Sequence, residues 1–152
     1  MAPSNEPDLS DIAEQLRQAI GRLVRTTRAH ADSLPRTHAE TLGYLSREGS
    51  RTIAELAALR RVKHQSMSRT VGELDGLGYI SRAPNPADAR GFVITLTPAG
   101  AEALDTDRAA RREWVAAAIA TELTPEEQQL LAVVPALLNR LADRAGADGA
   151  ER

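Results

Sequence analysis

Apolar residues recur at helical spacing near the start of the chain, and this spacing predicts an amphipathic helix over about 9–31. Its apolar positions are Leu9, Ile12, Leu16, Ile20, Leu23 and Val24. Pro35 then opens a second predicted helix, over 36–47, and Gly49 ends it. The chain is therefore expected to begin with one long and one shorter helix.

Two short helices are predicted next, separated by a short turn. The first, over 52–59, starts with a capping box in which Thr52 is followed three residues later by Glu55. The second, over 64–77, is closed by Gly78, the residue type that most often follows a helix end. Two such helices in succession are typical of a helix-turn-helix.

A β-hairpin is predicted directly after these helices. Its first strand lies at 79–82 and its return strand at 92–96. In the return strand Phe92, Ile94 and Leu96 alternate with other residues, which predicts a definite inner face. A helix-turn-helix followed by a hairpin wing is typical of proteins that hold duplex DNA by two grooves.

The last two predicted helices share a favourable start, a threonine cap followed by proline. The two starts are Thr97-Pro98 and Thr124-Pro125. The helices are expected to run to about 121 and about 144, and Glu127 completes a second capping box. Pro135 lies inside the last helix and is expected to kink it.

The terminal helices carry more apolar surface than a small monomer needs, which predicts a two-fold homodimer. The broadest face consists of Leu130, Leu131, Val134, Leu137, Leu138 and Leu141. The alternative is that these helices cover the core of their own chain. The predicted organisation is dimerisation helices at 9–31 and 98–144, a DNA-binding domain at 35–97, and flexible tails at 1–8 and 145–152.

Composition narrows the class of protein. Apolar residues make up 42% of the chain and aromatic residues 3%, so the core is expected to be aliphatic. The absence of cysteine removes disulfides, thiolate metal sites and thiol redox sensing. Residues 1–8 are Pro-rich and acidic rather than a signal peptide, and no apolar run approaches the roughly 20 residues that span a bilayer. We therefore expect a cytoplasmic protein without membrane contact.

Charge is unevenly distributed, although the net charge is only −2. From 56 to 72 there is no carboxylate, and the cations are Arg60, Arg61, Lys63 and Arg69. From 124 to 152 carboxylates outnumber arginines. A locally basic face on an acidic chain fits contact with phosphate at one place, although a solvated run of charges has the same composition.

The 64–77 helix has two contrasting sides. Met67, Val71 and Leu74 cluster on one, and the opposite side carries hydrogen-bonding residues and glycines. Gln suits adenine, Arg suits guanine, and Ser suits either a base or a phosphate. Lys63, at the cap position, is a poor cap that a nearby phosphate would explain. The DNA-binding residues predicted from this helix are Lys63, His64, Gln65, Ser66, Ser68 and Arg69; an ordinary amphipathic surface helix is the alternative.

The predicted wing adds three more DNA-binding residues, Arg82, Asp88 and Arg90. Arg90 is expected near the tip of the loop, where it would enter the minor groove, whose negative potential favours arginine. Asp88, two residues earlier, is expected to hold the Arg90 guanidinium in a fixed direction.

The chain resembles the MarR family of winged-helix regulators. The matching residues are Leu74-Asp75-Gly76-Leu77-Gly78-Tyr79-Ile80 with Arg82, then Asp88-Ala89-Arg90, then Leu96-Thr97-Pro98-Ala99-Gly100, and the helix order matches over about 9–144. The resemblance implies a mainly α fold with a small β-hairpin wing, interlocked terminal helices, and homodimers on palindromic operator DNA. Departures are Lys63, Gly72 and Pro135. We predict a repressor, although the sequence does not distinguish one from an activator.

The resemblance also implies a small aromatic or anionic effector between the dimer helices and the DNA-binding domain. The candidate effector residues are Arg22, His30, His38, Tyr44 and Trp114, each of which also has an ordinary structural explanation. A metal shared by His30 and His38 lacks support, because there is no His-x-x-x-His pair and no cysteine. We expect no metal and no cofactor.

An enzyme is not indicated. The sequence has no cysteine nucleophile, no Gly-rich phosphate loop and no recognisable paired carboxylates. The stronger rival is a winged helix that binds protein without sequence-specific DNA binding. The polar outer stripe of Gln65, Ser68 and Arg69 favours DNA, because an apolar stripe would have favoured a protein partner.

Overall fold

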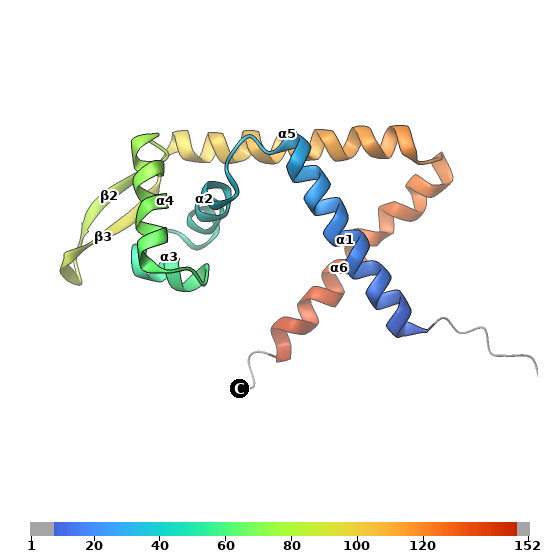
Figure 1. Ribbon diagram of the computed structural model, residues 1–152, viewed down its shortest axis with the longest axis horizontal. Helices are drawn as coiled ribbons and strands as arrows, with labels where there is room; N and C mark the ends of the chain where they lie inside the picture. Colours follow the sequence, from blue (N-terminus) through green and yellow to red (C-terminus); the bar gives the residue numbers. More distant parts are fainter. Residues whose placement is uncertain (1–7, 149–152) are drawn as a thin grey trace, which may run out of the picture. The chain divides into compact units, whose positions relative to one another are not determined.

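The computed structural model describes residues 8–148 (Figure 1). In chain order its elements are α1 (Leu9–Ala31), α2 (Arg36–Glu48), β1 (Arg51–Thr52), α3 (Ile53–Leu59), α4 (His64–Gly76), β2 (Ile80–Asn85), β3 (Asp88–Leu96), α5 (Pro98–Glu122) and α6 (Pro125–Asp148). The mainly helical fold with a β-hairpin wing is confirmed. The chain divides into two compact units, residues 1–112 and 113–152.

The predicted helix caps are confirmed by hydrogen bonds. Thr52 Oγ1 accepts from the backbone N–H of Glu55 at 3.2 Å, and Glu55 Oε2 accepts from the backbone N–H of Thr52 at 2.7 Å. Thr124 and Glu127 form the same reciprocal pair at the start of α6. These caps satisfy backbone donors that a helix start otherwise leaves without partners.

Two helix ends differ from the predicted tails. Asp8, expected in the N-terminal tail, caps α1 by accepting a hydrogen bond from the backbone N–H of Ser10 at 2.8 Å. At the other end α6 runs to Asp148, so 145–148 are helical. The rest of the predicted tails, 1–7 and 149–152, lies outside the described residues.

The sheet has three strands in the order β1-β3-β2, one more than the sequence predicted. The added strand, β1, is only two residues long, too short to leave a hydrophobic pattern. The hairpin is also longer than predicted. Asp88 and Arg90 lie in β3 rather than in a loop, and the turn is confined to Pro86 and Ala87. Pro84 is tolerated inside β2 because β2 is an edge strand.

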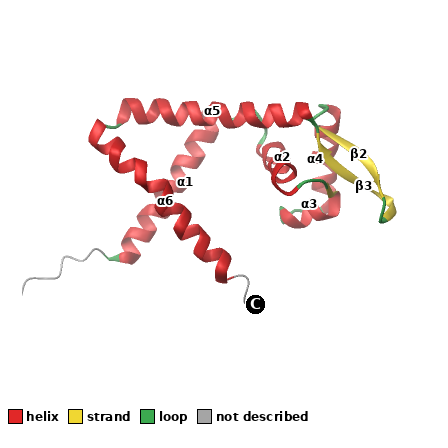
Figure 2. Cartoon of the chain, turned by 180° about the vertical axis from the view of Figure 1, so that it is seen from behind, coloured by secondary structure: helices red, strands yellow, loops and turns green. Residues whose placement is uncertain are grey.

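The core of the first unit lies between the helices of the helix-turn-helix and the base of the sheet. Its buried apolar residues are Leu42, Leu45, Leu56, Ala57, Met67, Val71, Leu74, Ile80, Ile94 and Leu104. The predicted inner stripe of α4 is fully buried. The predicted inner face of β3 holds for Ile94, but Phe92 is exposed. The tip of the β2–β3 hairpin projects away from α3 and α4 (Figures 1 and 2).

The start of α5 is locked onto the end of α4. Thr97 Oγ1 donates to the carbonyl of Gly78 at 2.6 Å and accepts from the backbone N–H of Gly100 at 3.1 Å. A Cβ at buried Gly100 would collide with the carbonyl oxygen of Tyr79. The sequence Leu96-Thr97-Pro98-Ala99-Gly100 therefore serves a close contact between helix and backbone.

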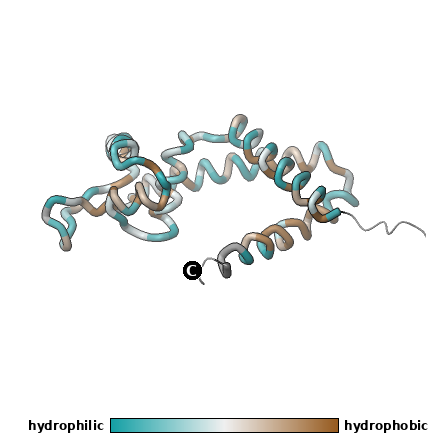
Figure 3. Tube along the Cα trace, turned by 60° about the horizontal axis from the view of Figure 1, so that its bottom comes forward, coloured by the Kyte–Doolittle hydropathy of each residue, from teal (hydrophilic) through white to brown (hydrophobic). Residues whose placement is uncertain are grey.

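Apolar side chains are left exposed on both terminal helices. On α1 they are Leu9, Ile12, Ile20, Leu23 and Val24, and on α6 they are Leu130, Val133, Leu137 and Leu141. Figure 3 shows α6 as a largely hydrophobic helix. The helix continues through Pro135 as one element. None of the described helices is both long enough and apolar enough to cross a membrane.

Candidate nucleic-acid interface

The outer side of α4 presents the predicted reading residues to solvent. His64, Gln65, Ser66 and Arg69 are exposed, and Ser68 is half-buried. Their placement follows from the buried Met67–Val71–Leu74 stripe, which turns the opposite side of the helix outward. The structure thus brings together on one accessible face the residue types that suit base edges and phosphates.

The first turn of α4 is open to an anion. Lys63 stands at the N-cap position and makes no side-chain cap hydrogen bond, as the sequence predicted. Backbone N–H groups at an uncapped helix start carry partial positive charge and suit a phosphate oxygen. The cation at Lys63 adds to that field.

The turn before α4 contains a strained arginine. Arg61 has φ 51°, and its backbone N–H donates to Ala58 while that of Val62 donates to Ala57. This is the hydrogen-bond pattern in which glycine normally holds the left-handed position. Gly78 occupies the equivalent position after α4, with φ 73°. An arginine at this place costs backbone strain that a glycine would avoid.

The wing carries its charged residues differently from the sequence prediction. Asp88 Oδ1 accepts a hydrogen bond from the backbone N–H of Arg90 at 3.0 Å, and no ion pair joins the two side chains in the described part of the chain. Asp88 therefore stabilises the start of β3 through the backbone. Arg82 Nε pairs with Asp75 Oδ2 of α4 at 3.0 Å, which ties the wing to the recognition helix.

The glycines on α4 have different surroundings. A Cβ at Gly72 would lie 3.9 Å from Nη2 of Arg82, so the Arg82 side chain lies over this position. A Cβ at Gly76 would meet nothing within 4 Å. The surface close to Gly72 is thus the wing arginine, and nothing in the structure explains Gly76.

Helix α4 and the wing formed by β2 and β3 border a cavity of about 420 Å³. It is lined by Thr52, Ile53, Ala54, His64, Asn85, Asp88, Arg90, Gly91 and Phe92. Residues predicted separately, His64 from α4 and Asp88 and Arg90 from the wing, therefore border one concave surface. The start of α3 forms its third side, a contribution that the sequence did not indicate.

A carboxylate also lies among the cations of α4. Glu73 Oε1 accepts from Arg69 Nε at 3.0 Å, and Glu73 Oε2 lies 2.8 Å from His38 Nε2 of α2. The His38 imidazole and then the Arg69 guanidinium hold the pKa of the Glu73 carboxyl below its ordinary value, so the group is ionised at neutral pH. Glu73 was not among the residues predicted from the sequence, although its position four residues after Arg69 is a signal for an ion pair.

A second and larger cavity, about 630 Å³, lies behind the helix-turn-helix. It is lined by Arg28, Asp32, Arg36, Ala39, Glu40, Gly43, Tyr44, Arg47, Leu59, Arg60, Arg61, Leu104, Arg108 and Arg111. Burial disfavours ionisation of Glu40, but hydrogen bonds from Arg36 and Arg60 outweigh it and lower the Glu40 pKa. Arginines outnumber the carboxylates in the lining, so the cavity suits an anion.

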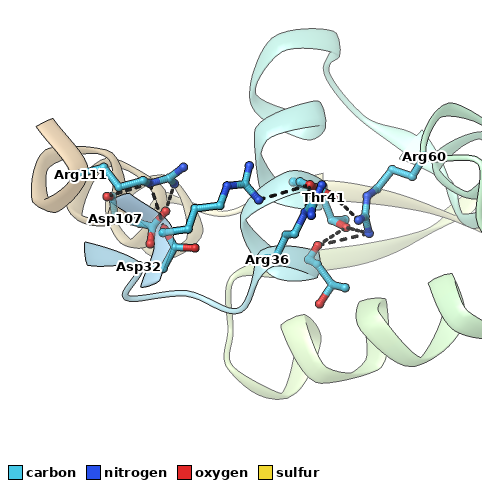
Figure 4. A network of polar contacts seen from close by, with 9 residues as sticks. Asp32, Arg36, Thr41, Arg60, Asp107 and Arg111 are labelled. Atoms are coloured by element: carbon cyan, nitrogen blue, oxygen red, sulfur yellow. Dashed lines mark hydrogen bonds and ion pairs between the residues drawn. The ribbon is translucent and has the colours of Figure 1, made fainter. Parts of the chain in front are cut away.

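Arg111, one of the lining residues, pairs with a fully buried carboxylate, Asp107 of α5 (Figure 4). Its Oδ1 accepts from the backbone N–H groups of Ser33 and Leu34 at 2.8 and 3.0 Å, and its Oδ2 pairs with Arg111. Arg111 also reaches Asp32 at 3.5 Å. This network fixes the connection between α1 and α2 onto α5.

The predicted effector residues are spread over several environments. Tyr44 lines the larger cavity, with the Arg47 guanidinium 5.2 Å from its ring centre. Arg22 and His30 are exposed on α1, and His38 is buried against Glu73; none of these three is among the lining residues. Trp114 belongs to the second unit. Among the described residues, no cluster of three histidines or carboxylates could hold a metal.

Comparison with known proteins places this architecture in one family. The family model that matches is that of the MarR family, over residues 32–91. An HTH-type transcriptional regulator of Mycobacterium bovis is 34% identical over 136 residues, which are 88% of this chain and 94% of the relative. A Pseudomonas aeruginosa structure assigned as a transcriptional regulator has a TM-score of 0.75 at 32% identity and covers 88% of this chain and 95% of that one.

A variant of S. aureus MepR, solved bound to an oligodeoxyribonucleotide, has a TM-score of 0.62 at 18% identity and covers 86% of this chain and 97% of that one. At this identity the likeness concerns the fold alone. The match to the family model and the identity with the M. bovis relative show membership of the family, not only a shared fold. With its helix-turn-helix, its wing and these relatives, the chain belongs to the MarR family of transcriptional regulators.

Proposed function

We propose that this regulator is a repressor that binds pseudo-palindromic duplex DNA as a homodimer and releases it when a small anionic ligand occupies the arginine-lined cavity. The observation that carries the proposal is the surface around the 420 Å³ cavity. There the uncapped start of α4 and the charged residues of the wing border one concave region.

Each part of this surface suits a different part of the duplex. The exposed start of α4 matches a helix lying in the major groove, with Gln65 and Arg69 facing base edges. Arg90 in the wing is exposed and suits the minor groove or its flanking phosphates. The binding of an oligodeoxyribonucleotide by S. aureus MepR, which shares the fold, supports this assignment.

Homodimerisation is proposed from the exposed apolar side chains of α1 and α6. Leu9 is 78% exposed and Leu130 is 71% exposed. Exposed apolar side chains gathered on a helix support an interface with another chain. A second copy of the chain is the proposed partner, because a two-fold dimer presents two recognition helices to the two halves of a palindrome, about 34 Å apart.

Ligand control is proposed from the chemistry of the larger cavity. Glu40 holds Arg28, Arg36 and Arg60 together, so an anionic ligand would exchange with Glu40 for these guanidinium groups. Arg60 and Arg61 belong to the turn that leads into α4, so such an exchange would shift this turn and with it the start of α4. A ligand that weakens DNA binding about 100-fold must prefer the non-binding state by about 2.7 kcal/mol.

The experiment that tests DNA binding is selection of duplexes from a random pool by the full chain, with the winners aligned for dyad symmetry. We expect a palindrome with half-sites about one helical turn apart. Sedimentation at micromolar concentration supplies the second readout, and a dimer is expected. Selection of unrelated duplexes, or a monomer, would refute the corresponding part of the proposal.

The alternative, a winged helix that binds only protein, is tested by the same measurement. It predicts that affinity for the selected duplex equals affinity for random DNA at every salt concentration. The exposed polar residues of α4 favour the DNA-binding function, because Gln and Arg side chains suit base edges in the major groove.

A further inference from the structure

One carboxylate faces the DNA-binding surface at a position where a negative charge opposes binding. Glu73 lies on α4 one turn after Arg69 and is ionised at neutral pH. Repulsion from phosphate predicts that such a group weakens association with DNA. Its two oxygens are both engaged, one by Arg69 and one by His38, so the carboxylate has a defined direction.

His38 provides a rigid anchor for this carboxylate. The His38 side chain is buried in α2, and its Nε2 lies 2.8 Å from Glu73 Oε2. An ionised carboxylate only accepts hydrogen bonds, so Nε2 carries the proton and donates. The other ring nitrogen, Nδ1, is buried without a hydrogen-bond partner in the described part of the chain. The anchor is thus an imidazole that is fixed by packing and donates from Nε2.

The anchored carboxylate restricts the side chain of Arg69. Its side chain is 84% exposed and would otherwise sample many rotamers. Glu73 occupies the Nε–H group of Arg69, and the described residues offer no partner to Nη1 or Nη2. The two terminal amino groups are the pair of donors that matches guanine O6 and N7 in the major groove. Holding Nε therefore leaves the guanine-reading edge free and directed.

We propose that Glu73, fixed by His38 of α2, is a positioning residue that orients Arg69 to read a guanine rather than to contact a phosphate. The proposal rests on the proposed DNA-binding function and adds to it a residue that determines specificity. It also assigns α2 a role in base recognition, although α2 does not itself reach the DNA-binding face.

The test compares two affinities for each variant, one for the selected duplex and one for a random duplex of equal length. In Glu73→Ala the ratio of the two is expected to fall about three- to tenfold, which lies in the lower part of the range for residues coupled within one ion-pair network. Affinity for random DNA is expected to stay equal or rise, because a negative charge has left the surface. In an Arg69→Ala background, Glu73→Ala is expected to leave the ratio unchanged.

Two further variants separate positioning from folding and from net charge. His38→Leu removes the donor to Glu73 and is expected to lower the ratio as Glu73→Ala does, whereas His38→Gln keeps a donor and is expected to restore it. Glu102→Ala, which removes an exposed carboxylate from α5, is the charge control and is expected to leave the ratio unchanged. Thermal melts confirm that each variant is folded.

The outcomes separate this proposal from the proposed function. If Arg69→Ala lowers the ratio and Glu73→Ala does not, Glu73 does not position Arg69, while DNA reading by Arg69 stands. If Glu73→Ala raises affinity for both duplexes equally, Glu73 is only a repulsive charge. A higher affinity for the selected duplex alone would mean that Glu73 holds Arg69 away from DNA. If the wild-type chain does not distinguish the two duplexes, both proposals fail.

Discussion

Asp107 provides a direct test of how the regulator holds its α1–α2 connection. The side chain is fully buried, and its Oδ1 accepts all three hydrogen bonds from the connection. These come from the backbone N–H of Ser33 at 2.8 Å, the Ser33 hydroxyl at 3.1 Å and the backbone N–H of Leu34 at 3.0 Å. Its Oδ2 pairs with Arg111. Oδ1 thus holds the α1–α2 connection, and Oδ2 holds Arg111.

Removing the carboxylate leaves the donors of Ser33 and Leu34 without their acceptor and takes one of two carboxylate partners from Arg111. For Asp107→Ala we expect a loss of about 3–5 kcal/mol, the cost of breaking a buried ion pair by deleting one partner. Asp107→Asn keeps Oδ1 and loses only the Arg111 pair. Arg111 is partly exposed and retains Asp32 at 3.5 Å, so this variant is expected to lose about 1–2 kcal/mol.

The assay is urea unfolding followed by far-UV circular dichroism, at one fixed protein concentration for all variants. With a slope that is the same in wild type and variants, the midpoints convert directly into differences in unfolding free energy. Equal losses for the Ala and Asn variants would show that the Arg111 pair, not the Ser33 and Leu34 hydrogen bonds, holds the connection. A loss below about 1 kcal/mol in Asp107→Ala would refute the reasoning.

Four other outcomes are expected. Gly100→Ala should lower stability by about 1–3 kcal/mol in urea unfolding, because its methyl group overpacks against the Tyr79 carbonyl; an unchanged midpoint would contradict this. Arg61→Gly should raise stability by up to about 1 kcal/mol by relieving the left-handed backbone, and a lower melting temperature would count against strain at that position. Arg90→Ala should reduce the salt dependence of DNA affinity by about two units per dimer, whereas parallel salt plots with equal intercepts would mean that the wing does not touch DNA. The Glu40 pKa is lower in the folded protein than in the unfolded chain, so its contribution to stability is present above the ordinary Glu pKa and is lost as pH falls through the folded value. From about pH 6 to about pH 3 the free energy of unfolding should therefore decline less steeply in Glu40→Gln than in wild type.

Local patterns in the sequence were sufficient to predict the helices and their order. The capping boxes at Thr52 and Thr124, and the glycine after α4 at Gly78, are read from residues three or four apart. The same is true of the buried stripe on α4. These signals are local because a helix satisfies its backbone hydrogen bonds within a few residues. The family resemblance also rested on short segments, at 74–80, 88–90 and 96–100, which include Gly78 but neither capping box.

The hydrophobic pattern of the sequence did not predict the full length of the hairpin strands. Strand β1 is two residues long and exists only because Arg51 and Thr52 pair with Ile94 and Val93 of β3. Asp88 and Arg90 were expected in a loop, yet both belong to β3, and the edge strand β2 opposite accommodates Pro84. Pairing partners, not the strand's own residues, decided where each strand ended.

The candidate site also has a part that the sequence predicts and a part that it does not. The outer residues of α4 were predictable, because an amphipathic helix exposes whatever lies opposite its buried stripe. The contacts that position them were not: His38 lies 35 residues from Glu73, and Asp107 lies 74 residues from Ser33. The arginine cavity draws on four helices, α1, α2, α3 and α5, and on the turn after α3. Only the packed structure brings such residues together, because hydrogen bonds and ion pairs act over a few ångströms whatever the separation along the chain.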